Sequence, residues 1–346
     1  MRRRPVTWLG GTFAFVLACG ACAGPDADAA QTSNVIAAAP SAVPVESISS
    51  AAMLGRIRFL ASDALGGRGT PSPGLDLAAA YIASEFEAMG LRAAGVDFIQ
   101  RYPLAQGPNA PSAPNVVAVL DGSDPTLRDT YVVFSAHMDH LGHGNPDASG
   151  DSIYNGADDD ASGTAAVLEI AEAFASLGTR PARSVAFLLV SGEELGLLGS
   201  QAFLRSNAIP TNQIVANINI DMIGRNASDT VVAIGKPYSS LGTAVDETAR
   251  SHPELGLTVV DDLWPDEQFF FRSDHFNFAR AGVPALFFFA GVHEDYHRPS
   301  DEVERIDADK AARIARLAFL LGLALADAEQ PPEWTPRGRR EVLGTR

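Results

Sequence analysis

The chain has 346 residues, of which 46% are hydrophobic, and a formal net charge of −16 at pH 7. This length is ample for one large buried core. So acidic a chain is poorly suited to bind polyanions, and we therefore expect no nucleic-acid partner and no direct binding to anionic lipid.

Residues 1–22 predict a secretory signal. A basic start, Met1-Arg-Arg-Arg, is followed by an apolar run from Trp8 to Ala18 that small residues interrupt. This run is too short to span a membrane comfortably. The segment Val16-Leu-Ala-Cys19 also fits a lipoprotein cleavage site, so that lipidation of Cys19 and ordinary cleavage both stay open. We expect an exported protein that is periplasmic, lipid-anchored to the cell envelope or secreted, with a lipid anchor as its only membrane contact.

The segments around the expected domain have distinct compositions. Both cysteines, Cys19 and Cys22, lie in the predicted leader, so the exported domain is expected to contain no internal disulfide. Residues 23–45 are rich in Ala, Pro, Ser and Asp, which predicts a flexible linker. We expect a single domain over 46–328 and a polar C-terminal tail over 329–346.

Helix-spaced apolar residues alternate along the chain with short apolar runs. In chain order, the first half predicts helices over 48–62 and 75–89, strands over 115–120 and 130–136, and a helix over 162–177. The second half predicts strands over 184–190, 215–220, 230–234 and 284–290, and helices over 196–206, 242–251 and 308–325. Apolar strands that alternate with helices are typical of a largely parallel sheet covered on both faces. The expected fold is a three-layer α/β/α domain with a mixed, largely parallel central sheet.

Five side chains of metal-binding type follow or lie near these predicted strands and helices: His137, Asp159, Glu194, Asp221 and His297. Sites in open α/β sheets form at the carboxyl ends of the strands, where three of these residues fall. Two imidazoles and three carboxylates can hold two zinc-class ions, with one carboxylate bridging and positions left for water. The set predicts a hydrolytic two-metal site.

Two of the candidate segments carry further signals. His137 and Asp139 are two residues apart at a strand end, so Asp139 can accept a hydrogen bond from the ring nitrogen that does not face the metal. Three adjacent carboxylates at 158–160 precede a predicted helix; one would suffice as an N-cap, whereas three repel one another unless a cation neutralises them. The remaining histidines are expected to be non-ligands: His140, His143, His252, His275 and His293.

Glu193 and Glu194 follow a buried apolar strand, where neighbouring side chains diverge. One carboxylate can bind a metal while its neighbour accepts a proton from the attacking water. Asp221 also follows a buried strand, a costly place for an acid unless it is paired or bound to a metal. A structural salt bridge is the alternative for Asp221.

In this order, the segments resemble the secreted di-zinc aminopeptidase family, which also includes glutamate carboxypeptidase, glutaminyl cyclase and the transferrin receptor. The similarity extends from about Ile57 to Ile306 and includes the motifs at 59–70 and 271–285. It implies a two-zinc site in which His137 and Asp221 bind one ion, Glu194 and His297 bind the other, and Asp159 bridges both. It also implies that Asp139 orients His137 and that the peptide bond between Asp159 and Asp160 is cis.

The resemblance further implies the residues that handle substrate. Glu193 corresponds to the general base that acts on a metal-activated water, and Tyr296 to a residue that holds the oxyanion. Arg272 lies where some members anchor the amino terminus, while Met222 and Phe289 lie where they line the pocket for the first side chain. Apart from the resemblance, Trp264 and the aromatic run 269–271 are further candidates for a hydrophobic specificity pocket, although such clusters are more often plain core.

The function expected from these residues is that of a zinc-dependent aminopeptidase, which hydrolyses amino-terminal residues from peptides. Peptides are the expected partners, and two zinc ions per chain the expected cofactors. A glutaminyl cyclase-like or deacylase enzyme of the same fold is an alternative, which a content of one zinc per chain would favour. A catalytically inactive binding protein is a third, but it would have no reason to keep costly clustered acids.

Overall fold

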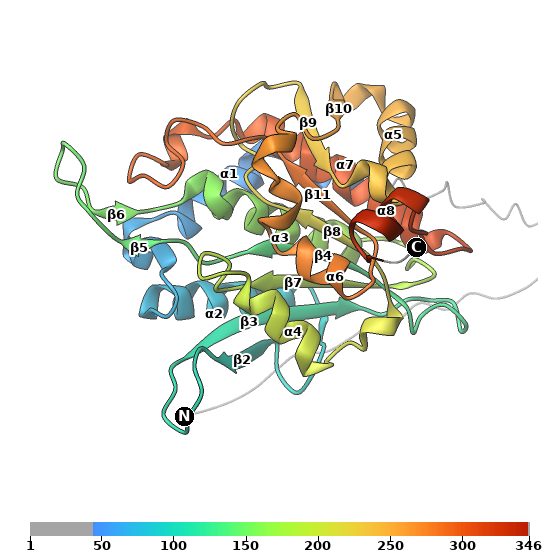
Figure 1. Ribbon diagram of the computed structural model, residues 1–346, viewed down its shortest axis with the longest axis horizontal. Helices are drawn as coiled ribbons and strands as arrows, with labels where there is room; N and C mark the ends of the chain where they lie inside the picture. Colours follow the sequence, from blue (N-terminus) through green and yellow to red (C-terminus); the bar gives the residue numbers. More distant parts are fainter. Residues whose placement is uncertain (1–43, 345–346) are drawn as a thin grey trace, which may run out of the picture. The chain divides into compact units, whose positions relative to one another are not determined.

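The computed structural model describes residues 44–344, in which nine strands form one central sheet (Figure 1). The sheet order is β1-β3-β7-β4-β8-β11-β9-β10, with β2 also paired to β3. The strands are β1 Arg92–Ala93, β2 Ile99–Pro103, β3 Ser112–Leu120, β4 Tyr131–His137, β7 Ser184–Val190, β8 Ile214–Ile220, β9 Thr230–Ile234, β10 Thr258–Val260 and β11 Ala285–Phe289. The four central strands β7, β4, β8 and β11 run parallel, and antiparallel pairs flank them. This mixed sheet confirms the predicted fold class.

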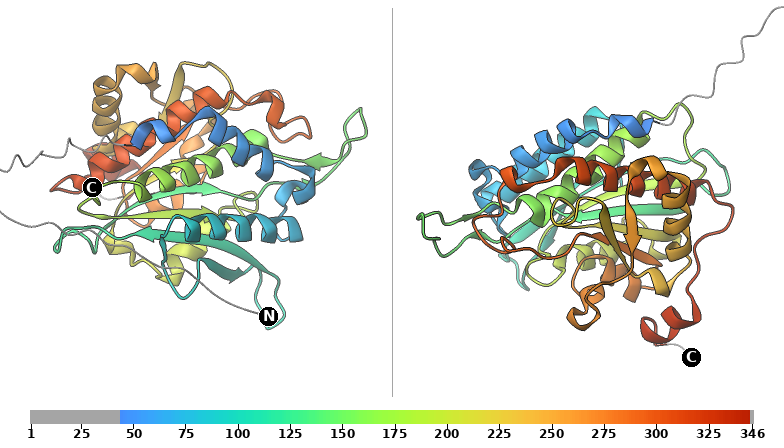
Figure 2. Two further views of the ribbon diagram at one scale, coloured as in Figure 1. Left: turned by 180° about the vertical axis from the view of Figure 1, so that it is seen from behind. Right: turned by 90° about the horizontal axis from the view of Figure 1, so that it is seen from above.

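Helices cover both faces of the sheet, as the views from behind and above show (Figure 2). They are α1 Ser50–Leu60, α2 Pro73–Ala88, α3 Gly163–Ala175, α4 Leu198–Ser206, α5 Leu241–Ser251, α6 His275–Arg280, α7 Ala308–Asp327 and α8 Pro336–Glu341. Helices α1, α2, α3 and α7 lie against one face, and α4 and α6 against the other. Neighbouring residues of β3 point to opposite faces, so that Val116 joins the core under α1 and α7 whereas Val117 joins the core under α4 and α6.

Local sequence signals explain where several helices begin. The side chain of Ser49 caps α1 by accepting from the backbone N–H of Ala52. Ser72 caps α2 in the same way, and Pro73 occupies the first turn, where a missing N–H costs nothing. The predicted strands over 184–190 and 230–234 have the observed bounds. The other predicted strands and helices differ from the observed ones by up to three residues at one or both ends.

Several elements were not predicted. The short strands β1, β2 and β10 lie toward the edges of the sheet, where apolar patterning is weak, and β5 Gly142–His143 pairs with β6 Ile153–Tyr154 in a separate hairpin. Helices α6 and α8 have only six residues each. Elements this short bury too few side chains to leave a clear periodic pattern.

The predicted N-terminal segments fall almost entirely outside the described residues, whereas most of the predicted C-terminal tail falls within them. The predicted leader over 1–22 and all but two residues of the predicted linker over 23–45 lie outside the described residues. The described part of the predicted tail, residues 329–344, carries more structure than its composition indicated. Thr335 caps α8, and the indole N–H of Trp334 donates to the carbonyl of Gly282 over 2.9 Å. Between residues 44 and 344, no helix has both the length and the hydrophobicity needed to cross a bilayer.

Candidate metal centre

The five predicted metal ligands lie together at one edge of the sheet. Strands β4, β7 and β8 are parallel neighbours, so their carboxyl ends meet and bring His137, Glu194 and Asp221 close to one another. Asp159 reaches the same place from the helical turn η3 Ala157–Ser162 before α3, and His297 from the loop after β11. The topology therefore assembles in space what is separated in sequence.

An inner group consists of His137, Asp159 and Asp221. Nε2 of His137 lies 3.2 Å from Oδ1 of Asp159 and 3.6 Å from Oδ1 of Asp221. All three residues are buried, and one ligand atom from each lies within 4.8 Å of those of the others. Ligands on a tetrahedral zinc ion with bonds of about 2.0 Å are roughly 3.3 Å apart, so the observed separations fit such an ion.

An outer group shares Asp159 and adds Glu194 and His297. Nε2 of His297 lies 3.1 Å from Oδ2 of Asp159 and 3.3 Å from Oε2 of Glu194. The two carboxylate oxygens of Asp159 thus face different imidazoles, Oδ1 toward His137 and Oδ2 toward His297. This is the arrangement that a bridging carboxylate requires.

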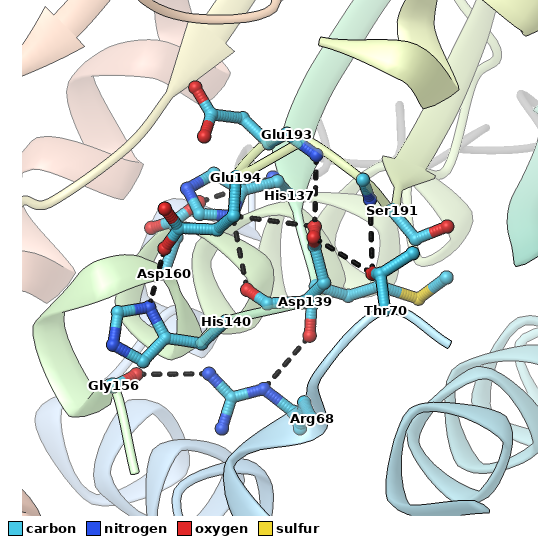
Figure 3. A network of polar contacts seen from close by, with 12 residues as sticks. Arg68, Thr70, His137, Asp139, His140, Gly156, Asp160, Ser191, Glu193 and Glu194 are labelled. Carbon is cyan, nitrogen blue, oxygen red and sulfur yellow. Dashed lines mark hydrogen bonds and ion pairs between the residues drawn. The ribbon is translucent and has the colours of Figure 1, made fainter. Parts of the chain in front are cut away.

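His140 also belongs to the outer group, although it was predicted to be a non-ligand. Its Nδ1 lies 2.7 Å from Oε1 of Glu194 and 3.7 Å from Oδ2 of Asp159. These three residues form the second compact group of possible metal ligands among the described residues. Figure 3 shows His140 and Glu194 facing one another. The only sequence signal was its spacing of three residues from His137, which by itself has no metal-binding meaning.

The three adjacent aspartates have separate roles. Oδ1 of Asp158 accepts from the backbone N–H of Gly224 over 2.6 Å. Asp160 accepts from the N–H of Gly163 over 2.8 Å, at the start of α3, and only Asp159 faces the two groups of ligands. The peptide bond between Asp159 and Asp160 is cis, as the resemblance implied. Flanking hydrogen bonds therefore fix the turn that presents the central carboxylate.

The contacts of Asp139 differ from the expectation. Nδ1 of His137 lies 3.1 Å from the carbonyl oxygen of Asp139 and 3.7 Å from its carboxylate, so the carbonyl is the nearer partner. The carboxylate instead accepts from the hydroxyl of Thr70 over 2.9 Å and from the backbone N–H of Glu193 over 3.3 Å. Asp139 thus orients His137 through its backbone and ties the Glu193 loop to the end of β4 (Figure 3).

Arg68 joins the loop after His137 to the segment before the aspartate turn. Its guanidinium is fully buried and donates to four backbone carbonyls, those of Leu60, Met138, Asn155 and Gly156. Met138 follows the inner ligand His137, and Gly156 precedes the aspartate turn. Arg68 lies in the motif at 59–70, but no role was predicted for it, because nothing in the sequence shows that a charged side chain is buried.

The electrostatics of the site follow from crowding carboxylates around buried imidazoles. Burial opposes the charged form of His137, but carboxylates led by Asp221 outweigh it and raise its pKa well above the usual value. Burial likewise opposes ionisation of Asp159, yet the imidazoles led by His140 hold its pKa well below the usual range. Burial raises the pKa of Glu193 well above that of an ordinary glutamate. The cluster stabilises positive charge at its centre, which suits a cation.

A pocket opens beside the two groups. It is lined by all the predicted substrate residues, Glu193, Met222, Arg272, Phe289 and Tyr296, together with Phe269. Met222 and Phe289 are buried in its wall, and the ring of Tyr296 stacks on His297 at 3.9 Å. The guanidinium of Arg272 lies 4.7 Å over the ring of Phe269, at the rim.

The aromatic candidates divide between this pocket and its surroundings. Phe269 lines the pocket, and Trp264 packs behind it, with ring centres 5.7 Å from Phe269 and 5.8 Å from Phe289. Phe270 and Phe271 line a different cavity near Tyr238. Only part of the predicted aromatic cluster can therefore contact a substrate side chain.

Comparison with curated sequences finds relatives among peptidases. The chain is 28% identical over 225 residues to a probable leucine aminopeptidase of Arthroderma otae, a match that covers 62% of this chain and 58% of that protein. It is 26% identical over 286 residues to leupeptin-inactivating enzyme 1 of Streptomyces exfoliatus, covering 82% of this chain and 58% of that protein. The chain thus spans less than two thirds of the length of these relatives.

Solved structures show the same fold. The LapA aminopeptidase of Legionella pneumophila matches with a TM-score of 0.64 at 22% identity, covering 83% of this chain and 74% of that one. An aminopeptidase from Aneurinibacillus sp. strain AM-1 matches with a TM-score of 0.61 at 16% identity, covering 84% and 96%. The family model of peptidase family M28 matches residues 115–321, which contain every residue of the inner and outer groups. The chain belongs to peptidase family M28.

Proposed function

We propose that this protein is a zinc-dependent aminopeptidase that removes amino-terminal residues from peptides and uses two zinc ions. One observation carries the proposal: the two oxygens of Asp159 face two separate imidazole-containing groups, 3.2 Å and 3.1 Å away, at the wall of a pocket. The family and the zinc aminopeptidases among the matched structures, such as that of Bacillus subtilis, support the same activity.

The residues present fit zinc by type and by spacing. His137, Asp159 and Asp221 would hold one ion, and Asp159, Glu194 and His297 the other. When bound, the ions would polarise the scissile carbonyl and make a water nucleophilic at neutral pH. The separations of 3.1 to 3.6 Å between these donor atoms match those of ligands that share a tetrahedral ion.

The chain's own residues account for the proton transfers. Glu193 lines the pocket, and its carboxylate points away from that of Glu194, so the two acids divide their tasks (Figure 3). Because burial raises the pKa of Glu193, this side chain is suited to accept a proton from the attacking water and return it to the leaving amine. The hydroxyl of Tyr296 would donate to the oxyanion as negative charge develops on it.

The charge and the lining of the pocket also support binding of the amino-terminal end of a peptide rather than its carboxyl-terminal end. An excess of carboxylates around the centre favours a free ammonium group over a carboxylate, which favours an amino-terminal residue. Met222, Phe269 and Phe289 give the wall an apolar surface for the first side chain. We infer a preference for hydrophobic amino-terminal residues.

The site of action is a further part of the proposal. The basic and apolar residues at 1–22 and the cysteine at 19 are typical of an exported chain that is cleaved or lipidated. We propose that the domain acts outside the cytoplasm, with a lipid anchor as its only membrane contact if Cys19 is modified. Labelling with a radioactive fatty acid, compared between wild type and Cys19→Ser, would test the anchor.

Hydrolysis of a panel of amino acid p-nitroanilides tests the activity. We expect release of p-nitroaniline from leucine, methionine and phenylalanine derivatives, no release from their N-acetylated forms, and loss of turnover after treatment with a chelator. Release of acetate from the acetylated forms, with no release of p-nitroaniline from the free derivatives, would indicate a deacylase. Cyclisation of glutaminyl peptides without hydrolysis of the panel would indicate a cyclase.

A further inference from the structure

His140 is a buried imidazole of the outer group that the proposed mechanism does not use. Its side chain is 0% exposed, and the residue lies in the loop directly after β4. The ring packs so closely on Gly156 that an added Cβ at that glycine would lie 2.5 Å from the ring carbon Cγ. The backbone N–H of His140 donates to the carbonyl of Arg68 over 3.3 Å. Packing and backbone contacts therefore fix where the ring lies.

The nitrogen that faces Glu194 is close to it but is not hydrogen-bonded. Nδ1 of His140 lies 2.7 Å from Oε1 of Glu194. Within residues 44–344, neither ring nitrogen of His140 nor this oxygen makes a hydrogen bond of acceptable geometry. Buried polar atoms that stay unpaired are costly, so two such atoms in contact need a shared partner. An imidazole nitrogen and a carboxylate oxygen converge in this way on a common cation.

The two outer imidazoles approach Glu194 from different sides. His140 faces Oε1, whereas Nε2 of His297 lies 3.3 Å from Oε2. Both also face Oδ2 of Asp159, at 3.7 Å and 3.1 Å. Their rings meet edge to face, with centres 5.7 Å apart. The same two carboxylates are therefore flanked by two imidazoles rather than one.

We propose that His140 is an additional protein ligand of the outer metal position. This inference rests on the proposed function, since it takes zinc to be the ion that the groups bind. With His140 the outer position has four protein groups, typical of closed zinc sites, while the inner position has the three typical of sites that keep a place for water or substrate. The outer ion is then the more slowly released of the two.

Paired substitutions separate a ligand from a hydrogen-bond donor. His140→Asn places an amide N–H near the position of Nδ1 but is a poor zinc ligand, and His140→Ala removes both properties. We expect both variants to weaken one of the two zinc dissociation constants by about 10- to 100-fold or more, measured by competition with a chromophoric chelator. His143→Asn, at an exposed position in β5, should leave both constants unchanged. Wild-type affinity in His140→Asn would overturn the proposal, because a donor to Glu194 would then suffice.

X-ray absorption at the zinc edge gives a test that needs no variant. In wild-type protein loaded with one equivalent of zinc, we expect two imidazoles per ion, and one in His140→Asn. A single imidazole in the wild type would contradict the assignment of His140 while leaving the aminopeptidase proposal intact. Wild-type protein that binds no zinc would overturn both.

Discussion

The inner and outer groups of the metal centre are built in different ways. His137 and Asp221 follow directly from neighbouring strands and are almost completely buried, with 2% and 9% of their side chains exposed. His297 comes from a loop, has a left-handed backbone with φ of 56°, and is 36% exposed. The sheet therefore fixes the inner group, whereas a loop closes the outer one.

A chain of buried hydrogen bonds explains the rigidity of the inner group. Oδ2 of Asp221 accepts from the hydroxyl of Ser273 over 2.7 Å, and this hydroxyl accepts from the amide of Asn219 over 2.8 Å. Oδ1 of Asn219 accepts in turn from Ser135, within β4. The outer group has no comparable chain among the described residues, but it has more candidate ligands. In the proposed two-zinc centre, preorganisation would secure the inner ion and the number of ligands would secure the outer one.

The largest effects should separate the two adjacent glutamates. Glu193→Gln is expected to lower kcat by about 10²- to 10⁴-fold, because the general base is lost, while both zinc ions remain. Glu194→Gln should release the outer ion and leave the inner one. Kinetics on leucine p-nitroanilide and zinc content by mass spectrometry measure both effects. Loss of zinc from Glu193→Gln would show that the two roles are assigned to the wrong residues.

Removal of Arg68 should damage both groups together, because its guanidinium joins their loops. Arg68→Met would leave four buried carbonyl acceptors without their donor, and we expect the free energy of unfolding to fall by about 3 kcal/mol or more. Urea unfolding in excess zinc measures the change. Arg58→Met, at an exposed position in α1, is the control and should change stability little. Equal stability of the two variants would contradict a structural role for Arg68.

Substitution of Ser273 should affect the inner group alone. Ser273→Ala removes the hydroxyl that orients Asp221, and we expect zinc affinity at the inner position to fall by about 10-fold. Affinity at the outer position should not change. Ser84→Ala, on the surface of α2, serves as a control in the same titration. An equal loss of zinc affinity at both positions would show that the inner and outer groups are not separately supported.

A histidine outside both groups should affect how stability depends on pH. Burial lowers the pKa of His275 to about 3, and its ring stacks on Phe287. Between pH 6.5 and 3 the unfolded chain binds a proton at this residue that the folded protein does not, so acid should reduce stability by about 1.4 kcal/mol per pH unit through His275 alone. His275→Phe should lose this part of the pH dependence. The difference in unfolding free energy between wild type and variant, measured at pH 7 and at pH 5, separates the contribution of His275 from any release of metal. The same pH dependence of stability in both proteins would contradict the prediction.

Strand ends were the part of the site that the sequence could predict. His137 and Asp221 fall directly after apolar runs long enough to be recognised as strands, and parallel neighbours bring such ends together. The bridging position of Asp159 and the role of His297 came from resemblance, since a turn and a polar loop carry no periodicity that places them. The structure brings all of these residues together.

Other features could not be predicted because they depend on tertiary packing. The sequence around His140 is that of an ordinary loop, and packing of its ring against Gly156 places it beside Glu194. The hydrogen bond of His137 goes to the carbonyl of Asp139 rather than to the predicted carboxylate, a choice decided by a loop conformation. Polar contacts across the sheet, such as that of Ser273 with Asp221, join residues 52 positions apart.

Anomalous diffraction at the zinc edge, from crystals of the zinc-loaded protein, tests the central claim most directly. We predict two peaks that flank the carboxylate of Asp159, one beside His137 and Asp221 and the other beside Glu194 and His297. A single peak, or none at these residues, would contradict the two-zinc centre.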